Sequence, residues 1–490
     1  MILAKLLGFV IASYLACLLV PIRFRWMVLF ASSLFFYALS GTVALVTMIL
    51  ASAFSFSCGI LIEKSPVGSR IRRAVLFAGI LIVVVWLCTV KFAAACSHRG
   101  FLFAVPLGIS YASFSIMSYL ADIYWERDRA DRNFLKHLLY ILFFPKIIQG
   151  PISRHGFISP SLFEGRPLSF KNFCFGCQRM MYGLFKKLVI AERLSRVTQV
   201  FFSDIGRFSG SRIAVAMVLA AIELYCDFSG YMDIVLGFTE SIGMNMEENF
   251  RHPFFSCSVS EFWRRWHITL GAWFRDYVYT PLVMSRVVKR IGKWCRKRIG
   301  KEFCNKLMKS IAIAAVWLLT GLWHGTGANY ILWGCMWGCL IILSTVLDGI
   351  YKKSLAFLHI NAVAPLWKLF QMLRTALIFC FGILLTRIPN LSDARTAIAK
   401  LLNVFDVQAF FAKFPGVSGL NTYDIIVAMP FIVLLLLISI VQEKQSVRVL
   451  VSNFAAPVRW GIYAVGISFI VFFGTDGSEY GAGGFAYAYF

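Results

Sequence analysis

The chain of 490 residues is 59% hydrophobic, 16% aromatic and only 15% charged, with a mean hydropathy of +0.73. This composition is typical of an integral membrane protein and excludes an ordinary soluble globular protein. The formal net charge of +25 does not indicate nucleic-acid binding, because most basic residues separate apolar segments and no nucleic-acid-binding motif is present.

Apolar segments recur along the whole chain, near 1–20, 27–41, 43–62, 74–92, 101–124, 138–152, 173–192, 211–238, 310–323, 328–348, 369–387, 424–441 and 458–473. By the length needed to cross a bilayer, we expect about ten to twelve spans in one all-α membrane domain over residues 1–490. Segments 27–41, 138–152 and 310–323 are short enough to be re-entrant or tilted elements. Proline and glycine divide the domain into residues 1–125, a core at 138–350 and a C-terminal part at 351–490.

Basic clusters between the apolar segments predict the orientation under the positive-inside rule. Arg23 and Arg25, and then Lys64, Arg70, Arg72 and Arg73, mark the cytosolic side. Residues 27–62 should therefore form a helical hairpin, with the N-terminus outside. Lys444, Arg448 and Arg459 precede the last apolar segment, so the C-terminus should also lie outside.

Residues 286–309 contain ten Lys and Arg side chains and one Glu. The apolar residues Val287, Val288, Ile291, Trp294 and Cys295 have the spacing of one helical face, which predicts an interfacial helix on the cytosolic surface. Its cations would serve topology and attraction to anionic lipid headgroups. A docking surface for an anionic acyl donor or an acidic carrier is the alternative, and the sequence does not decide between them.

The cysteines do not indicate a disulfide framework or a metal site. Most of the thirteen lie in apolar segments, as small buried hydrophobic residues do. Cys174 and Cys177 form a single CxxC with no second pair or histidine cluster, so no metal is expected. The apolar start to Val20 lacks a polar cleavage region, and we interpret it as an uncleaved first span.

Acidic residues gather in one apolar segment at Asp227, Asp233 and Glu240, which Ser229-Gly230 is expected to interrupt. Asp227 and Asp233 share a helical face only if that pair breaks the helix. The simpler interpretation is helix-end capping and pairing with nearby arginines, namely Arg264, Arg265 or Arg275. Direct catalysis is the alternative.

Two histidines stand beside aromatic residues in apolar surroundings. His267 ends the stretch Trp263-Arg264-Arg265-Trp266-His267, and His324 lies in Trp323-His324-Gly325-Thr326-Gly327. An ionisable group at membrane depth usually faces a cavity or pathway, and a partly buried imidazole can accept a proton at physiological pH. A single histidine is more often structural, but the second one favours catalysis.

The remaining histidines are expected to be ordinary surface or interface residues, because they lie near charged or loop segments: His98, His137, His155, His252 and His359. The sequence contains no HExxH, GxSxG or phosphate-binding glycine loop. It therefore does not resemble an intramembrane metalloprotease, a serine hydrolase or an ATP-driven pump.

Four stretches resemble the membrane-bound O-acyltransferase (MBOAT) superfamily, most closely its bacterial polysaccharide branch typified by alginate O-acetyltransferase. They are residues 106–124 with Pro106-Leu107-Gly108, residues 143–152 with Phe144-Pro145-Lys146 and Gln149-Gly150-Pro151, the block 226–282, and residues 321–334. Together they span roughly residues 100–350. The ending at 485–490 is similar to the aromatic C-terminus of that branch.

The resemblance implies the MBOAT fold, with helices around a central tunnel, in a bacterial plasma (inner) membrane. It also implies that His324 is the catalytic histidine and His267 the second functional one. No cofactor would be bound. An acyl thioester, either acetyl-CoA or an acylated carrier phosphopantetheine, would enter from the cytosol, and a polysaccharide or a partner acetyltransferase would accept the acyl group outside. Residues expected to line the tunnel or support the site are Asp227, Ser229, Tyr231, Trp263, Arg264, Arg265, Trp266, Trp323 and Asn329.

Under this hypothesis His324 is the general base on the acceptor hydroxyl. Holding both reactants in line lowers the entropic barrier, and His267 or nearby donors steady the oxyanion. Two alternatives stay open: D-alanyl transfer to teichoic acid from a carrier protein, and a non-enzymatic transporter or flippase. The identity of the neighbouring genes would distinguish D-alanyl transfer from acetyl transfer. Repeat symmetry, or substrate movement that requires no histidine, would support a transporter or flippase.

Overall fold

The computed structural model describes residues 2–96, 106–388, 390–403 and 422–475, which are almost entirely helical. Two compact units are present. Unit 1 comprises Met1–Arg196, Glu223–Glu248 and Tyr423–Phe490, and unit 2 comprises Val197–Ile222 and Asn249–Thr422. The C-terminal residues 485–490, which carry the predicted aromatic ending, lie outside the described residues.

Unit 1 contains the N-terminal and C-terminal helices, and α10 and α11 continue into unit 2. In chain order the elements are α1 (Ile2–Leu19), α2 (Arg25–Ala38), α3 (Thr42–Lys64), α4 (Arg70–Cys96), α5 (Ile109–Tyr124), α6 (Phe134–Leu142), α7 (Phe144–Ile147), α8 (His155–Phe163), α9 (Phe170–Leu184), the π-helical η2 (Phe185–Ala191), α10 (Glu192–Ser203), α11 (Gly210–Ser241), α22 (Thr422–Gln442), α23 (Val447–Ser452) and α24 (Ala456–Phe473).

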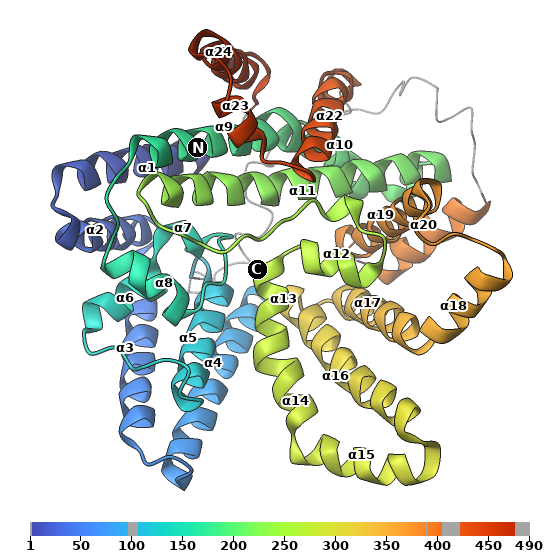
Figure 1. Ribbon diagram of the computed structural model, residues 1–490, viewed down its shortest axis with the longest axis horizontal. Coiled ribbons are helices and arrows are strands. Elements are labelled where there is room, and N and C mark those ends of the chain that lie inside the picture. The colour runs from blue at the N-terminus through green and yellow to red at the C-terminus, as the bar shows by residue number, and fades with distance from the viewer. Residues whose placement is uncertain (1, 97–105, 389, 404–421, 476–490) are drawn as a thin grey trace. The chain divides into compact units, whose positions relative to one another are not determined.

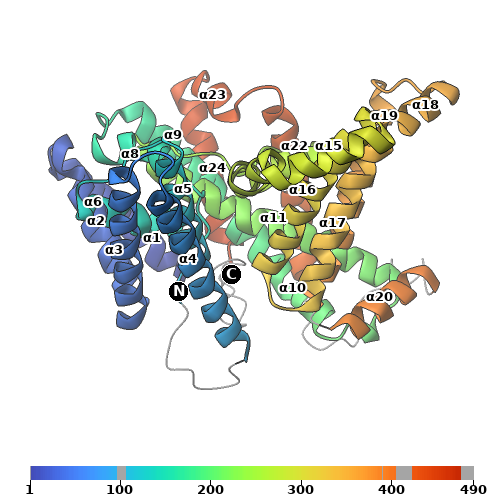
Figure 2. The same cartoon turned by 90° about the horizontal axis from the view of Figure 1, so that it is seen from below.

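Unit 2 contains the short helices around His267 and a set of longer ones. They are η4 (Pro253–Phe255), α12 (Val259–Arg265), α13 (Ile268–Phe274), the π-helical η5 (Arg275–Tyr279), α14 (Thr280–Met284), α15 (Arg286–Ile299), α16 (Lys301–His324), α17 (Ala328–Val346), α18 (Asp348–Phe357), α19 (Pro365–Arg387) and α20 (Leu391–Asn403). Figure 1 shows α16 and α17 as an antiparallel pair, and Figure 2 shows the same pairing from below.

Within unit 1, α3, α4 and α5 lie side by side (Figures 1 and 2). Segment 27–62 consists of α2 and α3, joined at Gly41, and of these two helices α3 is the one long and apolar enough to cross a membrane. Helix α5 is buried on every side, and Gly108 begins it in a left-handed conformation with φ +70°. A Cβ at Gly108 would lie 2.1 Å from the Ile147 carbonyl oxygen, so only glycine fits this turn.

Eight helices among the described residues are long and apolar enough to cross a membrane: Thr42–Lys64, Arg70–Ala93, Gly210–Ser241, Lys301–His324, Ala328–Val346, Pro365–Arg387, Tyr423–Gln442 and Ala456–Phe473. The expected all-α membrane class is confirmed. The number is below ten to twelve because several apolar segments are interrupted. Segment 138–152 breaks at Phe143, and segment 173–192 changes to a π-helical turn carrying Lys186 and Lys187.

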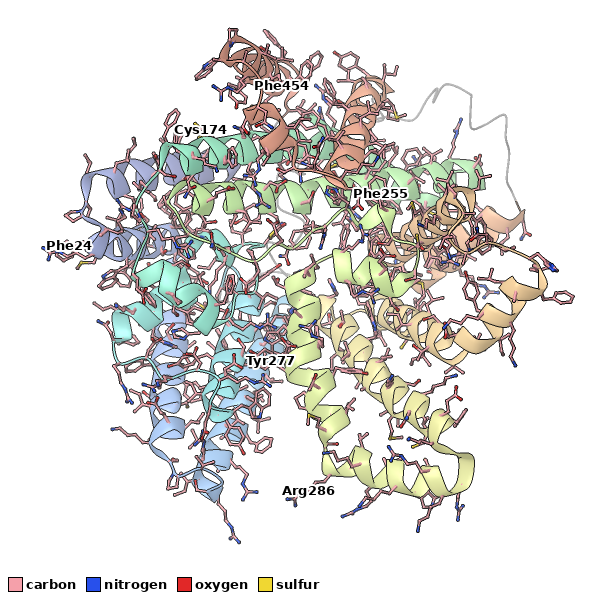
Figure 3. The ribbon with its side chains drawn as sticks, viewed as in Figure 1. Phe24, Cys174, Phe255, Tyr277, Arg286 and Phe454 are labelled. Atoms are coloured by element: carbon pink, nitrogen blue, oxygen red, sulfur yellow. The ribbon has the colours of Figure 1, made fainter. Side chains whose placement is uncertain are left out.

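Two expectations about individual helices are corrected. Segment 310–323 is not a short element, because the helix begins earlier, at Lys301, and reaches 24 residues. Segment 286–309 is not one helix, because Gly300, with φ +83°, ends α15 and starts α16. Figure 3 marks Arg286 at the start of α15.

Candidate functional site

The region around His267 is fixed by local hydrogen bonds in unit 2. Ser258 caps α12 by accepting from the Glu261 amide at 3.2 Å, and Glu261 accepts in return from the Cys257 amide at 2.9 Å. This reciprocal capping pattern sets the start of the helix. Trp266 then forms an antiparallel bridge with Phe250, which brings the chain to His267.

His267 itself adopts φ +47° at the start of α13, an uncommon left-handed conformation for a residue with a Cβ. The adjacent Ile268 amide donates to the Asn249 carbonyl at 3.0 Å. Both the amide and the hydroxyl of Thr269 donate to Asn249 Oδ1, at 2.9 and 2.7 Å. These bonds hold the strained residue in place, and strain of this kind is concentrated at functional sites.

The imidazole of His267 is only 3% exposed. Burial lowers its pKa to about 3 from its ordinary value near 6.5, because the charged form loses hydration. His267 is therefore neutral at physiological pH.

His324 ends α16, where α16 and α17 approach each other closely. A Cβ at Gly321 would lie 2.6 Å from the Tyr330 carbonyl oxygen, and one at Gly334 would lie 2.5 Å from the Trp317 carbonyl oxygen. Gly325 next to His324 is equally restricted, since a Cβ there would lie 2.3 Å from the Tyr330 ring. Glycine at these positions permits the backbone contact that fixes His324.

Aromatic rings surround the two histidines. The Trp323 ring centroid lies 6.3 Å from that of His267 and 4.6 Å from that of His324. Trp333 of α17 meets His324 edge-on at 4.7 Å. His324 is 8% exposed. The structure thus brings His267, Trp323 and His324 into one aromatic environment.

The other predicted residues of unit 2 surround this environment or support it. Trp266 is buried and stacks on Phe262 at 5.6 Å. Asn329 is buried and donates to the carbonyls of Leu385 and Ile388, at 3.3 Å each, which ties α17 to the end of α19. Arg264 is exposed, and Arg265 pairs with Glu261 at 2.9 Å on its own helix.

The predicted residues of unit 1 lie on α11, where two of them contact lysines of η2. Asp227 pairs with Lys187, which also lies 2.7 Å from Glu192. Ser229 accepts from Lys186 Nζ at 2.9 Å, and the buried Tyr231 hydroxyl donates to the Pro145 carbonyl at 3.4 Å.

The expected pairing of the acidic residues with Arg264, Arg265 or Arg275 is therefore wrong. Asp233 pairs with Arg179 at 2.9 Å and Lys186 at 2.6 Å. Glu240 pairs with Arg448 at 2.6 Å, and Arg275 pairs with its neighbour Asp276 at 2.9 Å.

The expected break at Ser229-Gly230 is also wrong, because α11 runs unbroken from Gly210 to Ser241. The glycines instead allow helix contact within unit 1. A Cβ at Gly230 would lie 2.9 Å from the Gly183 carbonyl oxygen, and one at Gly237 would lie 2.6 Å from the Gly176 carbonyl oxygen. Glycines seven residues apart on each helix thus meet in two pairs, a spacing that places each pair on one helical face.

The expectation that His137 and His155 are surface residues is wrong, since they are 0% and 6% exposed. His137 Nδ1 donates to Asp131 Oδ2 at 2.9 Å, and its Nε2 lies 2.8 Å from the Ser55 hydroxyl. His155 Nδ1 donates to Asp128 Oδ2 at 2.7 Å, and its Nε2 lies 3.0 Å from Asp131 Oδ2.

Contacts between histidine and aspartate side chains hold together this cluster in unit 1, which consists of His137, His155, Asp128 and Asp131. Burial favours neutral His155, but its contacts with Asp128 and Asp131 outweigh burial and raise its pKa to about 9. At Asp131, hydrogen bonds from His137 and His155 outweigh burial and lower the pKa to about 2. Of the other histidines, His359 is exposed and His252 half-buried, and His98 lies outside the described residues.

A multi-pass, all-helical membrane protein with two buried histidines in an aromatic environment is the class that these observations define. The family model described as MBOAT, membrane-bound O-acyltransferase family, matches residues 29–386. The chain belongs to this family, and it is an O-acyltransferase.

Several relatives of this chain carry names that describe their reactions. The chain is 29% identical over 420 residues to the probable alginate O-acetylase AlgI of Pseudomonas syringae pv. tomato, covering 83% of this chain and 75% of the relative. It is 28% identical to the peptidoglycan O-acetyltransferase of Helicobacter pylori, covering 64% and 62%. It is also 28% identical to the teichoic acid D-alanyltransferase of Bacillus subtilis, covering 50% and 60%.

Proposed function

We propose that this protein moves an acetyl group from a cytosolic thioester to a hydroxyl of an extracytoplasmic polysaccharide, or to a partner acetyltransferase that modifies it. The observation that carries the proposal is the buried His324 held between Trp323 and Trp333 in a chain of the MBOAT family. Names of relatives support acetyl transfer to a cell-envelope polymer.

The proposed chemistry needs one proton acceptor near the attacking hydroxyl. His324 takes the hydroxyl proton as the oxygen attacks the thioester carbonyl, the carbon–sulfur bond breaks, and the thiolate leaves with the proton. Neutral His267, with its lowered pKa, can donate a hydrogen bond to the oxyanion. No bound cofactor is required, because the thioester is a co-substrate. We also propose that a tunnel connects the donor side with the acceptor side.

The proposed orientation places α15 at the cytosolic surface of a bacterial inner membrane, with both termini outside. Three sides of α15 support an interfacial position. Val288 and Cys295 are 4% and 2% exposed, whereas Val287 and Trp294 are 67% and 58% exposed. The remaining side carries cations, Lys289, Lys293 and Arg296 among them. Such a helix can contact protein, acyl chains and anionic headgroups together.

D-alanyl transfer from a carrier protein is the second candidate, because teichoic acid D-alanyltransferases are among the relatives. The two are separated in inside-out membrane vesicles that contain the full chain and receive either acetyl-labelled CoA or a D-alanyl carrier protein. Acetyl label that reaches polymer in the vesicle lumen supports acetylation, and label only from the carrier supports D-alanylation. A His324→Gln variant that still moves substrate across the membrane would indicate a transporter.

A further inference from the structure

Four tryptophans of unit 2 form one cluster, which we term the indole cluster: Trp263 of α12, Trp317 of α16, and Trp333 and Trp337 of α17. The Trp263 ring centroid lies 4.8 Å from Trp317, 5.8 Å from Trp333 and 5.0 Å from Trp337. The other three pairs are separated by 6.0 to 6.4 Å. Every ring in the indole cluster therefore contacts the other three.

The indole cluster reaches His324 through Trp333. The imidazole meets the Trp333 ring at a centroid distance of 4.7 Å. A group that reacts next to His324 must therefore fit beside this indole. The ring also has little freedom to move, because the other three indoles pack against it and Trp333 is 6% exposed.

The helix backbones that carry the cluster are equally restricted. A Cβ at Gly338 would lie 3.1 Å from Trp317 Cβ, and one at Gly382 would lie 2.8 Å from the Trp337 ring. These close approaches lock α16, α17 and α19 around the indoles. Trp333 is therefore a firm boundary on the α17 side of His324.

The indole cluster also offers hydrogen-bond donors. Nε1 of Trp263 and Nε1 of Trp337 are buried and meet no acceptor within the described part of the chain. A buried donor of this kind is costly unless a ligand or water satisfies it. An acylated pantetheine arm combines an apolar chain with thioester and amide carbonyls, and so matches both the ring faces and the N–H groups.

We propose that the indole cluster binds the acyl end of the thioester donor and that Trp333 restricts this site to short acyl groups. The proposal rests on the proposed function, since it assigns donor specificity to the same site. Two structural observations carry it: the contact of Trp333 with His324 and the two buried indole N–H groups, of Trp263 and Trp337, that meet no acceptor among the described residues.

The test compares acetyl-, propionyl-, butyryl- and hexanoyl-CoA as competing donors for the full-length protein in vesicles. Trp333→Ala should raise the ratio of butyryl to acetyl transfer by about tenfold or more, because one methylene changes discrimination by about 10–200-fold. Trp333→Phe should raise it less. A ratio is independent of how much folded protein a variant yields.

Trp273→Ala is the matched control. Trp273 is 5% exposed and belongs to the same unit, but it packs on Phe274 and Tyr277 at 5.4 and 5.3 Å. This variant should leave the acyl ratio unchanged. An unchanged ratio in Trp333→Ala, or an equal change in Trp273→Ala, would overturn the assignment.

A second measurement covers variants that lose transfer altogether. Thioether analogues of the same acyl-CoAs compete for binding without reacting, and Trp333→Ala should bind the butyryl analogue more tightly relative to the acetyl analogue. Equal relative binding in wild type and variant would reject the proposal. If the wild-type protein binds and transfers no acyl-CoA, the proposed function itself fails, which is a different result from an unchanged chain-length preference.

Discussion

Both units contain a pair of buried histidines, but the two pairs have opposite surroundings. In unit 1, His137 and His155 contact aspartates, and the pKa of His155 rises to about 9. In unit 2, His267 and His324 contact indoles, and the pKa of His267 falls to about 3. Burial alone therefore does not distinguish a histidine that takes part in a reaction from one that stabilises the fold. Two carboxylate partners outweigh burial at His155 and raise its pKa, whereas burial prevails and lowers the pKa both at His137, beside Asp131, and at His267.

The largest expected effect follows from removing the proposed base. His324→Ala should lower acyl transfer by about 10²–10⁴-fold, because the acceptor hydroxyl then loses its proton acceptor. Membrane insertion and abundance should remain nearly normal. Transfer of labelled acetyl groups to polymer, measured per amount of inserted protein, provides the value.

Two further variants sharpen this result. His324→Gln keeps approximate size and hydrogen bonding but cannot accept the proton, so it should be as inactive as the alanine variant. His267→Ala should also impair transfer strongly. Near-normal activity in a well-expressed His324→Gln protein would refute the base assignment.

Substitution in the histidine pair of unit 1 should change the stability of the protein rather than its acyl-transfer activity. His155→Ala leaves Asp128 and Asp131 close together without their cation, and breaking a buried ion pair costs about 3–5 kcal/mol. We expect a clear loss of thermal stability in detergent. Exposed His359→Ala is the control and should behave as wild type; equal melting of His155→Ala and wild type would contradict the ionic role.

The two regions should also respond to pH in opposite directions. The folded pKa of His155 is raised, so its contribution to stability is complete below about 6.5 and is lost as pH rises through about 9. The folded pKa of His267 is lowered, so its contribution is present above about 6.5 and is lost as pH falls towards 3.

Melting curves from pH 4 to 10, with steps of about half a unit, should show the alkaline loss in wild type and its absence in His155→Ala. His267→Gln should reduce the acid-side loss. An alkaline loss of full size in His155→Ala would assign it to another group.

The smallest expected effect concerns α15. Replacing Lys293, Arg296, Lys297 and Arg298 by Gln should weaken use of the thioester donor and change stability by less than about 1 kcal/mol, since exposed charges contribute little to folding. Apparent donor affinity in vesicles measures the change. Unchanged affinity would leave these cations as a topology signal alone.

The sequence predicted the membrane class and the family, because hydropathy and local motifs are properties of neighbouring residues. The aromatic surroundings of His267 and His324 were also visible, since Trp266 and Trp323 directly precede them. The ion-pair partners of the charged residues were not visible in the sequence. Asp227 and Lys187 are forty residues apart, and only the packing of α11 on η2 brings them together.

The same limit explains the misjudged histidines and the misjudged Ser229-Gly230 pair. His155 meets Asp128 across 27 residues, which no local pattern indicates. Gly230 was interpreted as a break because glycine weakens an isolated helix. In the folded protein its missing side chain instead admits the Gly183 backbone.

The paired glycines of α9 and α11 also determine which changes in chain length the protein can accept. Inserting one residue between Gly230 and Gly237 turns the second glycine by about 100° around the helix, away from Gly176. Inserting seven residues restores its direction almost completely. Natural variation in length should therefore collect in the connections beyond Ser241, and this segment of α11 should keep its residue count even where its composition drifts.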